Sequence, residues 1–137
     1  MEEKNCIFCQ IVNKQIPSKI IYENDYNLAF LDIFPIGEGH TIVIPKKHYS
    51  NIEVIPEKDL IEIIKTVKYL SKLLHDKLNF DGYNILQNNF KAAGQVINHF
   101  HIHIIPRIEG DGKITQIIPK NQATDEELNE VLNLLIK

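Results

Sequence analysis

The segment HFHIHII, at residues 99–105, constrains the fold most strongly, because polar and apolar residues alternate in it without a break. Successive side chains of a β-strand point to opposite faces, so this alternation predicts a strand with two unlike faces. We expect the strand to span residues 96–106 and to stop at Pro106. One face carries three histidines: His99, His101 and His103. The other carries Phe100, Ile102 and Ile104, which we expect to pack in a core beneath a helix.

The rest of the sequence predicts an α+β fold. Apolar residues recur at steps of three and four between Leu60 and Leu78, which indicates a long amphipathic helix over about residues 57–78. Strands are expected at residues 19–25, 26–33, 41–45 and 82–89, and helices near residues 6–16 and 124–137, the latter capped by Thr124 with Glu127. Because most strands follow one another as hairpin-like neighbours, the pattern favours an antiparallel sheet of about five strands.

Composition excludes several classes of protein. The net charge is −3 and no basic stripe is present, which argues against a polymeric DNA or RNA partner. No apolar run approaches the ~20 residues that span a bilayer, and the charged N-terminus lacks the apolar core of a signal peptide. We therefore expect a cytoplasmic protein whose two cysteines stay reduced.

Three histidines on one strand face are compatible with several kinds of chemistry. At a rise of ~3.3 Å per residue, the outer two start ~13 Å apart, whereas a zinc–nitrogen bond is only ~2.0–2.1 Å long. One ion therefore does not easily reach all three, although two neighbours could share a metal. Nucleophilic or acid–base catalysis is the interpretation that we favour over a metal-binding trio or a row of histidines without a task.

The motif CIFC at residues 6–9 has three interpretations of its own. A thioredoxin-like redox motif requires a βαβ unit that the sequence does not provide. A disulfide is disfavoured in a reducing compartment. A zinc half-site is the third interpretation, and it needs two further ligands.

Several segments together resemble the HIT (histidine triad) family. Its signature segments are matched, in their usual order between residues 6 and 107, by CIFCQIV, AFLDI, GHTIVIPKKH, AAGQ, HFHIHII and HIIPR. The resemblance is to the small Hint and bacterial Hit-like branch. It implies a single HIT domain over residues 1–137, with a HIT-like α+β fold and a homodimer.

The resemblance also implies an activity. HIT enzymes cleave purine nucleotide conjugates, such as nucleoside phosphoramidates or dinucleoside polyphosphates, at the α-phosphate through a covalent nucleotidyl-histidine. The matching nucleophile is His101, while His103 would donate to a phosphoryl oxygen and His40 would orient the site. An ordinary imidazole has a pKa near 6.5, so the neutral ring is a ready nucleophile at neutral pH.

The implied site for an AMP-type ligand consists of residues that also have structural interpretations. Phe8, Ile11, Phe30 and Ile33 would surround the base, although they could equally belong to a core. Asp32 would accept hydrogen bonds from the ribose hydroxyls, or it could anchor a loop. Asn88 and Gln95 would contact the phosphate or the leaving group, with turn chemistry as the alternative for Asn88. Val96 stands where many relatives carry Ser or Thr, so that hydroxyl contact is lost.

In one branch of the family, His48 and His99 complete the cysteine half-site, giving a structural zinc bound by Cys6, Cys9, His48 and His99. Two rival functions remain: a zinc-stabilised nucleotide-binding or interaction module with little catalysis, and a metallohydrolase that uses the three histidines as ligands. The chain contains no tryptophan, so it lacks the tryptophan-bearing tail of the phosphoramidase branch, and the leaving group stays open.

Overall fold

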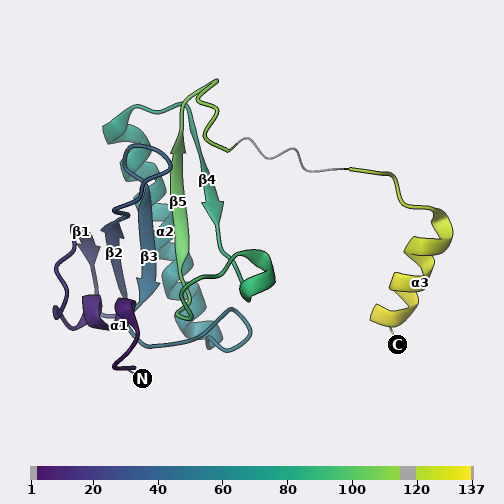
Figure 1. Cartoon of the computed structure of the whole chain (residues 1–137), viewed down its shortest axis with the longest axis horizontal. Helices are drawn as coiled ribbons and strands as arrows, with labels where there is room; N and C mark the ends of the chain where they lie inside the picture. The colour runs from purple at the N-terminus through teal and green to yellow at the C-terminus, as the bar shows by residue number, and fades with distance from the viewer. Residues whose placement is uncertain (1–2, 115–119, 137) are drawn as a thin grey trace.

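The computed structural model describes residues 3–114 and 120–136. Its elements follow the predicted α+β order (Figure 1): α1 (Ile7–Val12), β1 (Ile20–Glu23), β2 (Asn27–Leu31), β3 (Thr41–Pro45), α2 (Glu57–Leu78), β4 (Gly82–Leu86), the short 3₁₀ turn η1 (Lys91–Ala93), β5 (Ile102–Arg107) and α3 (Asp125–Leu135). The long helix matches its predicted bounds. It follows Pro56 and ends at Asn79, whose left-handed backbone terminates the helix.

The five strands form one antiparallel sheet in the order β1-β2-β3-β5-β4. The turn between β1 and β2 is set by Asn24, whose Oδ1 accepts hydrogen bonds from the backbone N–H groups of Tyr26 and Asn27. In the centre of the sheet, Val43 of β3 lies opposite Ile102 of β5. The sheet therefore brings the histidine-rich segment beside a strand more than fifty residues earlier in the chain.

Each face of the sheet supports its own core. Helix α2 lies behind the sheet in Figure 1, and Ile63, Val67, Leu70 and Leu74 pack there against the strands. As predicted, Phe100, Ile102 and Ile104 join this core. Helix α1 covers the opposite face, where Phe8 and Ile11 pack against Leu28, Phe30, Ile42 and Ile44. Since each fully buried side chain of this size contributes about 1.5–3 kcal/mol, the sheet is anchored from both sides.

The predicted strand over residues 96–106 is wrong at its beginning, because β5 starts only at Ile102. Its partner β3 ends at Pro45. The segment before Ile102 therefore contacts Pro45 itself and the loop that follows it. The backbone N–H of Phe100 donates to the carbonyl of Tyr49 (2.6 Å), and the ring of His99 lies against the carbonyl of Pro45. Only His103 of the three histidines is therefore within the strand. The strand predicted at 82–89 is also shorter, so Asn88 lies in the loop after β4.

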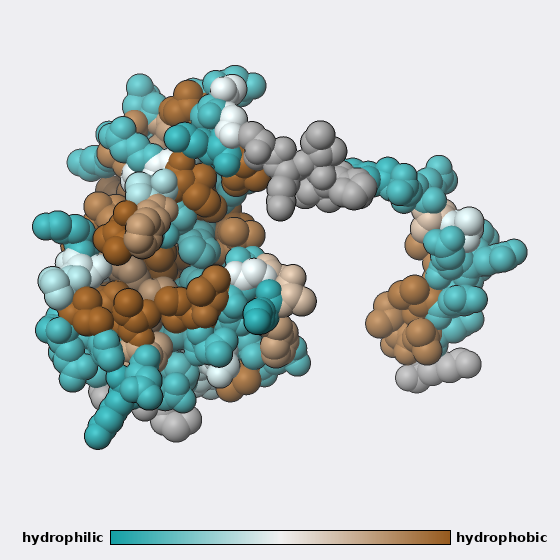
Figure 2. All heavy atoms as spheres, in the orientation of Figure 1, coloured by the Kyte–Doolittle hydropathy of each residue, from teal (hydrophilic) through white to brown (hydrophobic). Residues whose placement is uncertain are grey.

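The C-terminal helix α3 stands apart from the sheet (Figures 1 and 2). Its predicted cap is present, since the Thr124 hydroxyl accepts a hydrogen bond from the Glu127 N–H (3.2 Å). None of its residues is buried, and its apolar side chains gather on one side. Among the described residues, no helix combines the length and apolar character needed to cross a membrane.

Candidate active site

His101 lies just before β5 and is held by its own chain. Its Nδ1 is 2.7 Å from the carbonyl oxygen of His99. Because a carbonyl only accepts hydrogen bonds, Nδ1 must carry the proton, and the lone pair of the neutral ring is on Nε2. Burial lowers the pKa of His101, which keeps the ring neutral near pH 7. The ring lines a cavity of about 630 Å³, so it is placed as an acceptor or nucleophile.

A hydrogen bond from His40 fixes His103 in the opposite tautomer. The backbone N–H of Ile36 donates to Nδ1 of His40 (3.0 Å), so the neutral His40 ring carries its proton on Nε2. That Nε2 lies 2.9 Å from Nδ1 of His103, which therefore accepts. The remaining proton of His103 is on Nε2, so its ring is placed as a donor at the same cavity.

The two cavity histidines and His40 form a neutral cluster. The ring centroids of His101 and His103 are 5.0 Å apart, and those of His40 and His103 are 5.1 Å apart. Burial, followed by the neighbouring imidazoles of His101 and His40, lowers the pKa of His103 to about 4. Burial also lowers the pKa of His40. At neutral pH the site thus presents one lone pair and one N–H without a net charge on the rings.

Most residues predicted to bind the nucleotide line this cavity together: Phe8, Ile11, Phe30, Asp32, Ile33, Asn88, Val96, His101 and His103. Phe8 meets the rings of Phe30 and His101 edge to face, with centroids 5.6 and 5.1 Å apart. Further residues that the sequence did not point to also line the cavity: Ile7, Ile16, Pro17, Ser18, Leu31, Phe34, Ile36, Ile42, Leu86, Gly94, Ile97 and Ile105. Apart from Ser18 and Gly94 these side chains are apolar, and apolar character alone indicates only burial.

Asp32 is the carboxylate at this cavity. It follows β2, and its Oδ1 accepts a hydrogen bond from the backbone N–H of Phe34 (2.9 Å). Its Oδ2 lies 3.5 Å from Nε2 of His40. The carboxylate is partly exposed and lines the cavity, so it retains acceptor capacity for a ligand.

The side chain of Gln95 lies elsewhere. It does not line the cavity, and its amide is used within the protein. Its Oε1 accepts from the N–H of Phe90 (2.8 Å), and its Nε2 donates to the carbonyls of Ser50 (2.7 Å) and Ile97 (3.0 Å). Phe90 has φ 70° and ψ 160°, a conformation found almost only at glycine. In this structure the Gln95 side chain thus holds a strained loop next to the cavity, and its phosphate contact stays a prediction.

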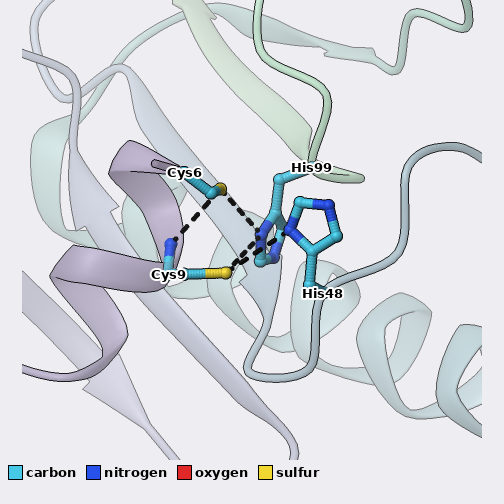
Figure 3. Close-up of side chains that lie close together, drawn as sticks. All are labelled: Cys6, Cys9, His48 and His99. Carbon is cyan, nitrogen blue, oxygen red and sulfur yellow. Dashed lines mark hydrogen bonds between the residues drawn. The ribbon is translucent and has the colours of Figure 1, made fainter. Parts of the chain in front are cut away.

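The other predicted ligands meet between α1 and the sheet (Figure 3). Sγ of Cys6 lies 3.4 Å from Nδ1 of His99, and Sγ of Cys9 lies 3.4 Å from Nδ1 of His48 and 3.6 Å from Nδ1 of His99. A tetrahedral zinc with bonds of about 2.3 Å to sulfur and about 2.05 Å to nitrogen requires a sulfur–nitrogen separation of about 3.6 Å. The donor atoms are thus already spaced for that ion.

The far sides of both imidazoles support the same interpretation. Nε2 of His99 lies 2.9 Å from the carbonyl of Pro45, and Nε2 of His48 lies 3.3 Å from a carboxylate oxygen of Glu3. Each ring therefore donates through Nε2 and directs the lone pair of Nδ1 toward the cysteines, as metal-bound histidines do. Burial raises the pKa of the Cys9 thiol, so a bound cation is what would hold it as a thiolate. These four residues fit a closed structural zinc site.

The three histidines do not form a metal site of their own. Within residues 3–114 and 120–136, only two groups bring three or more possible ligand atoms together, namely Cys6 with Cys9, His48 and His99, and Asp32 with His40 and His103. His99 belongs to the first group and His103 to the second, while His101 belongs to neither. The metallohydrolase that uses all three as ligands is therefore not supported.

Comparison with known proteins identifies the family. The HIT domain matches residues 13–110. An uncharacterized HIT-like protein of Methanocaldococcus jannaschii is 51% identical over 127 residues, which cover 92% of this chain and 98% of the relative. The crystal structure of a HIT family member from Bacillus subtilis superposes with a TM-score of 0.87 at 36% identity, covering 96% of this chain and 95% of that one. The chain belongs to the HIT family.

Other relatives carry names that state an activity or a metal. An adenosine 5'-monophosphoramidase of Saccharomyces cerevisiae is 43% identical over 102 residues, covering 74% of this chain and 62% of the relative. An adenylylsulfatase of Arabidopsis thaliana is 40% identical over 109 residues, covering 80% and 55%. A zinc-bound histidine triad protein from Mycobacterium smegmatis superposes with a TM-score of 0.77 at 33% identity, covering 96% and 95%. At the level of the family, the chain is thus assigned to the nucleotide hydrolases.

Proposed function

We propose that the protein cleaves purine nucleotide conjugates at the α-phosphate through a covalent intermediate on His101. The hydrogen-bond partners of the two adjacent cavity histidines, which assign opposite tautomers to them, are the observation that carries this proposal. One ring offers a lone pair and the other an N–H, and an in-line displacement at phosphorus needs both.

The chemistry follows from these two rings. The lone pair of Nε2 of His101 attacks phosphorus, and the bond from phosphorus to the leaving group breaks. Nδ1–H of His101 stays bonded to the carbonyl of His99, which holds the ring as positive charge develops on it. Nε2–H of His103 hydrogen-bonds to a phosphoryl oxygen where negative charge grows. Water then attacks the nucleotidyl-imidazole and releases the nucleoside monophosphate, so that one difficult displacement becomes two easier ones.

The proposed ligand is an AMP-type moiety. The apolar side chains of Phe8, Ile11, Phe30 and Ile33 form the slot for the base, and Asp32 accepts from the ribose hydroxyls. Relatives named adenosine 5'-monophosphoramidase and adenylylsulfatase support an adenylate with a nitrogen- or oxygen-linked leaving group. Val96 has no hydroxyl that could hydrogen-bond to the leaving group, so this position does not select one kind of leaving group. The proposal therefore includes dinucleoside polyphosphates.

A single-turnover experiment tests the intermediate. The protein is mixed with a substoichiometric adenosine phosphoramidate, quenched in alkali and examined by mass spectrometry. An adenylate adduct on the peptide that contains His101, absent from His101→Ala, supports the proposal. The exposed His75 of α2 provides the matched control, and His75→Ala must retain the adduct. If the unmodified protein binds AMP without any adduct or turnover, the alternative of a binding module with little catalysis replaces the enzyme.

Zinc enters the proposal as a structural ion. Cys6, Cys9, His48 and His99 would hold it, and when bound it would tie α1 to the sheet and to the segment before β5. The distances given above and the zinc-bound relative support this assignment.

We also propose a cytoplasmic homodimer formed through β4. This strand ends the sheet as described, and Tyr83, Ile85 and Leu86 on it are exposed. An apolar edge strand with unpaired backbone groups is suited to pair with a second copy of itself. Ile61 and Ile64 of α2 are also about half exposed. The two free cysteines match a reducing compartment.

A further inference from the structure

Asp32 carries the charge of the cavity that holds the histidines. Most side chains around this cavity are apolar, and the polar ones besides Asp32 are Ser18, Asn88, His101 and His103. Burial keeps both imidazoles neutral near pH 7. In the described part of the chain, no Lys, Arg or Glu lines the cavity. A positive charge that forms inside it therefore has a single carboxylate as its counter-charge.

The fold holds this carboxylate in a fixed position. Asp32 follows β2 and His40 precedes β3, and the adjoining residues Leu31 and Thr41 lie opposite each other in the sheet. The backbone N–H of Asp32 donates to the carbonyl of His40 (2.9 Å). Oδ1 of Asp32 accepts from the N–H of Phe34, and Oδ2 lies 3.5 Å from Nε2 of His40. One oxygen is thus held by the backbone while the other lies beside the histidines.

Asp32 stands at one end of a row of ionisable groups. Nε2 of His40 lies 2.9 Å from Nδ1 of His103, and the ring centroid of His103 is 5.0 Å from that of His101. Burial lowers the pKa of His40 and, together with the neighbouring imidazoles, that of His103, whereas the Asp32 carboxylate raises both. Asp32 is therefore the group that favours positive charge along this row.

The proposed reaction creates such a charge. When Nε2 of His101 bonds to phosphorus, the ring keeps its proton on Nδ1 and becomes positively charged. The leaving group departs with the electron pair of its bond to phosphorus. Once it has left, the groups enclosed in the cavity are more positive by one unit. Positive charge among apolar side chains is costly unless an opposite charge lies near it, so this step requires a negative group.

We propose that Asp32 is this counter-charge, and that it accelerates formation of the nucleotidyl-His101 independently of any contact with the sugar. The inference rests on the proposed function and adds a second task to the ribose contact assigned there to Asp32. The carboxylate acts across the row of His40 and His103 and is already oriented by the Phe34 N–H, so no rearrangement is needed when the charge appears.

A substrate without sugar hydroxyls separates the two tasks. Asp32→Asn removes the charge but keeps the size of the side chain and an oxygen for the Phe34 N–H. An adenosine phosphoramidate that lacks both ribose hydroxyls has none to donate to Asp32. With this substrate, we expect the maximal single-turnover rate of adenylate formation to fall roughly 10–30-fold in Asp32→Asn, the effect of one unit charge across several ångströms at an effective dielectric constant of about 20. The substrate concentration at half-maximal rate should change little.

Two further variants complete the experiment. Glu38→Gln removes a carboxylate from the loop before His40 that does not line the cavity, so it should keep the rate of the unmodified protein. Asp32→Glu restores the charge and should recover part of the rate lost in Asp32→Asn.

Three results have distinct meanings. If Asp32→Asn slows only the substrate that has its ribose hydroxyls, Asp32 serves the sugar alone and the inference is overturned. If Asp32→Glu is as slow as Asp32→Asn on the substrate without them, shape rather than charge matters, and the inference is again overturned. If the unmodified protein forms no adduct on His101 with either substrate, the proposed function itself fails.

Discussion

Nε2 of His40 lies 2.9 Å from Nδ1 of His103, and the backbone N–H of Ile36 bonds to the far side of the His40 ring. A backbone group thus determines, through one buried imidazole, which nitrogen of His103 carries the proton toward the cavity. His40 acts through His103, since its own ring does not line the cavity. It is a positioning residue in this arrangement.

Loss of His40 should therefore affect the chemical step more than binding. For His40→Ala we expect kcat to fall roughly 10–100-fold with KM little changed, as for other groups that orient catalytic side chains. His40→Gln should recover part of the rate because its amide N–H can donate to His103. The ¹⁵N chemical shifts of His103 should show the proton leaving Nε2 in the alanine variant. Equal losses in both variants with a raised KM would point to a merely structural role.

The buried His103 should make stability depend on pH. Its pKa is about 4 in the folded protein and about 6.5 when unfolded, so the unfolded chain binds the extra proton between these values. The free energy of unfolding should fall as pH decreases from 6.5 toward 4, by up to about 1.4 kcal/mol per pH unit for this residue. Urea denaturation at a series of pH values measures the slope.

Two variants check that assignment. His103→Gln should have a smaller slope than the unmodified protein over this window. Ile105→Val removes one buried methylene without changing a titratable group, so it should lower stability at every pH with the slope retained. Parallel curves for all three proteins would contradict the assignment to His103.

Removal of zinc should destabilise the fold before it touches the chemistry. We expect about one zinc per chain by elemental analysis, and a decrease in Tm of about 10 °C or more after chelation, since a few kcal/mol are lost with the ion. Cys9→Ser should have the same effect, and His75→Ala should not. If activity disappears at once on chelation while Tm is unchanged, the metal belongs to the reaction.

The strained backbone at Phe90 predicts a stabilising substitution. Phe90→Gly should raise the free energy of unfolding by about 1 kcal/mol, because glycine adopts φ 70° and ψ 160° without strain. Phe90→Ala is the matched control, since it removes the ring but keeps the strained conformation, and it should not stabilise. If both variants lose stability equally, contacts of the ring outweigh the strain. Chemical denaturation at pH 7 gives the comparison.

The sequence pattern predicted the ends of an element correctly where those ends depend only on the element's own residues. Helix α2 was predictable at both ends because its apolar period is long and begins after Pro56. Strand β5 was not, because alternation continues past the point where its partner β3 ends at Pro45. The start of β5 is thus decided by a strand far away in the sequence.

Some features of the site could likewise be predicted from local motifs, and others could not. The histidines and Asp32 were predictable from the motifs that they share with the family, and the cavity brings Asp32, His101 and His103 together. The anchoring role of Gln95 depends on Ser50 and Phe90, which no spacing rule connects. The apolar residues of α1 and the strands that line the cavity look like any other buried apolar side chains in the sequence.

His99 connects the cysteine cluster under α1 with the histidines at the cavity. The ring of His99 faces the cysteines, whereas its carbonyl oxygen holds Nδ1 of His101. Any shift of that backbone that accompanies a change at the cysteines would also move His101, the proposed nucleophile, two residues away. A substitution that changes how His99 is held by the cysteines therefore also changes how His101 is held, and neither can be redesigned alone.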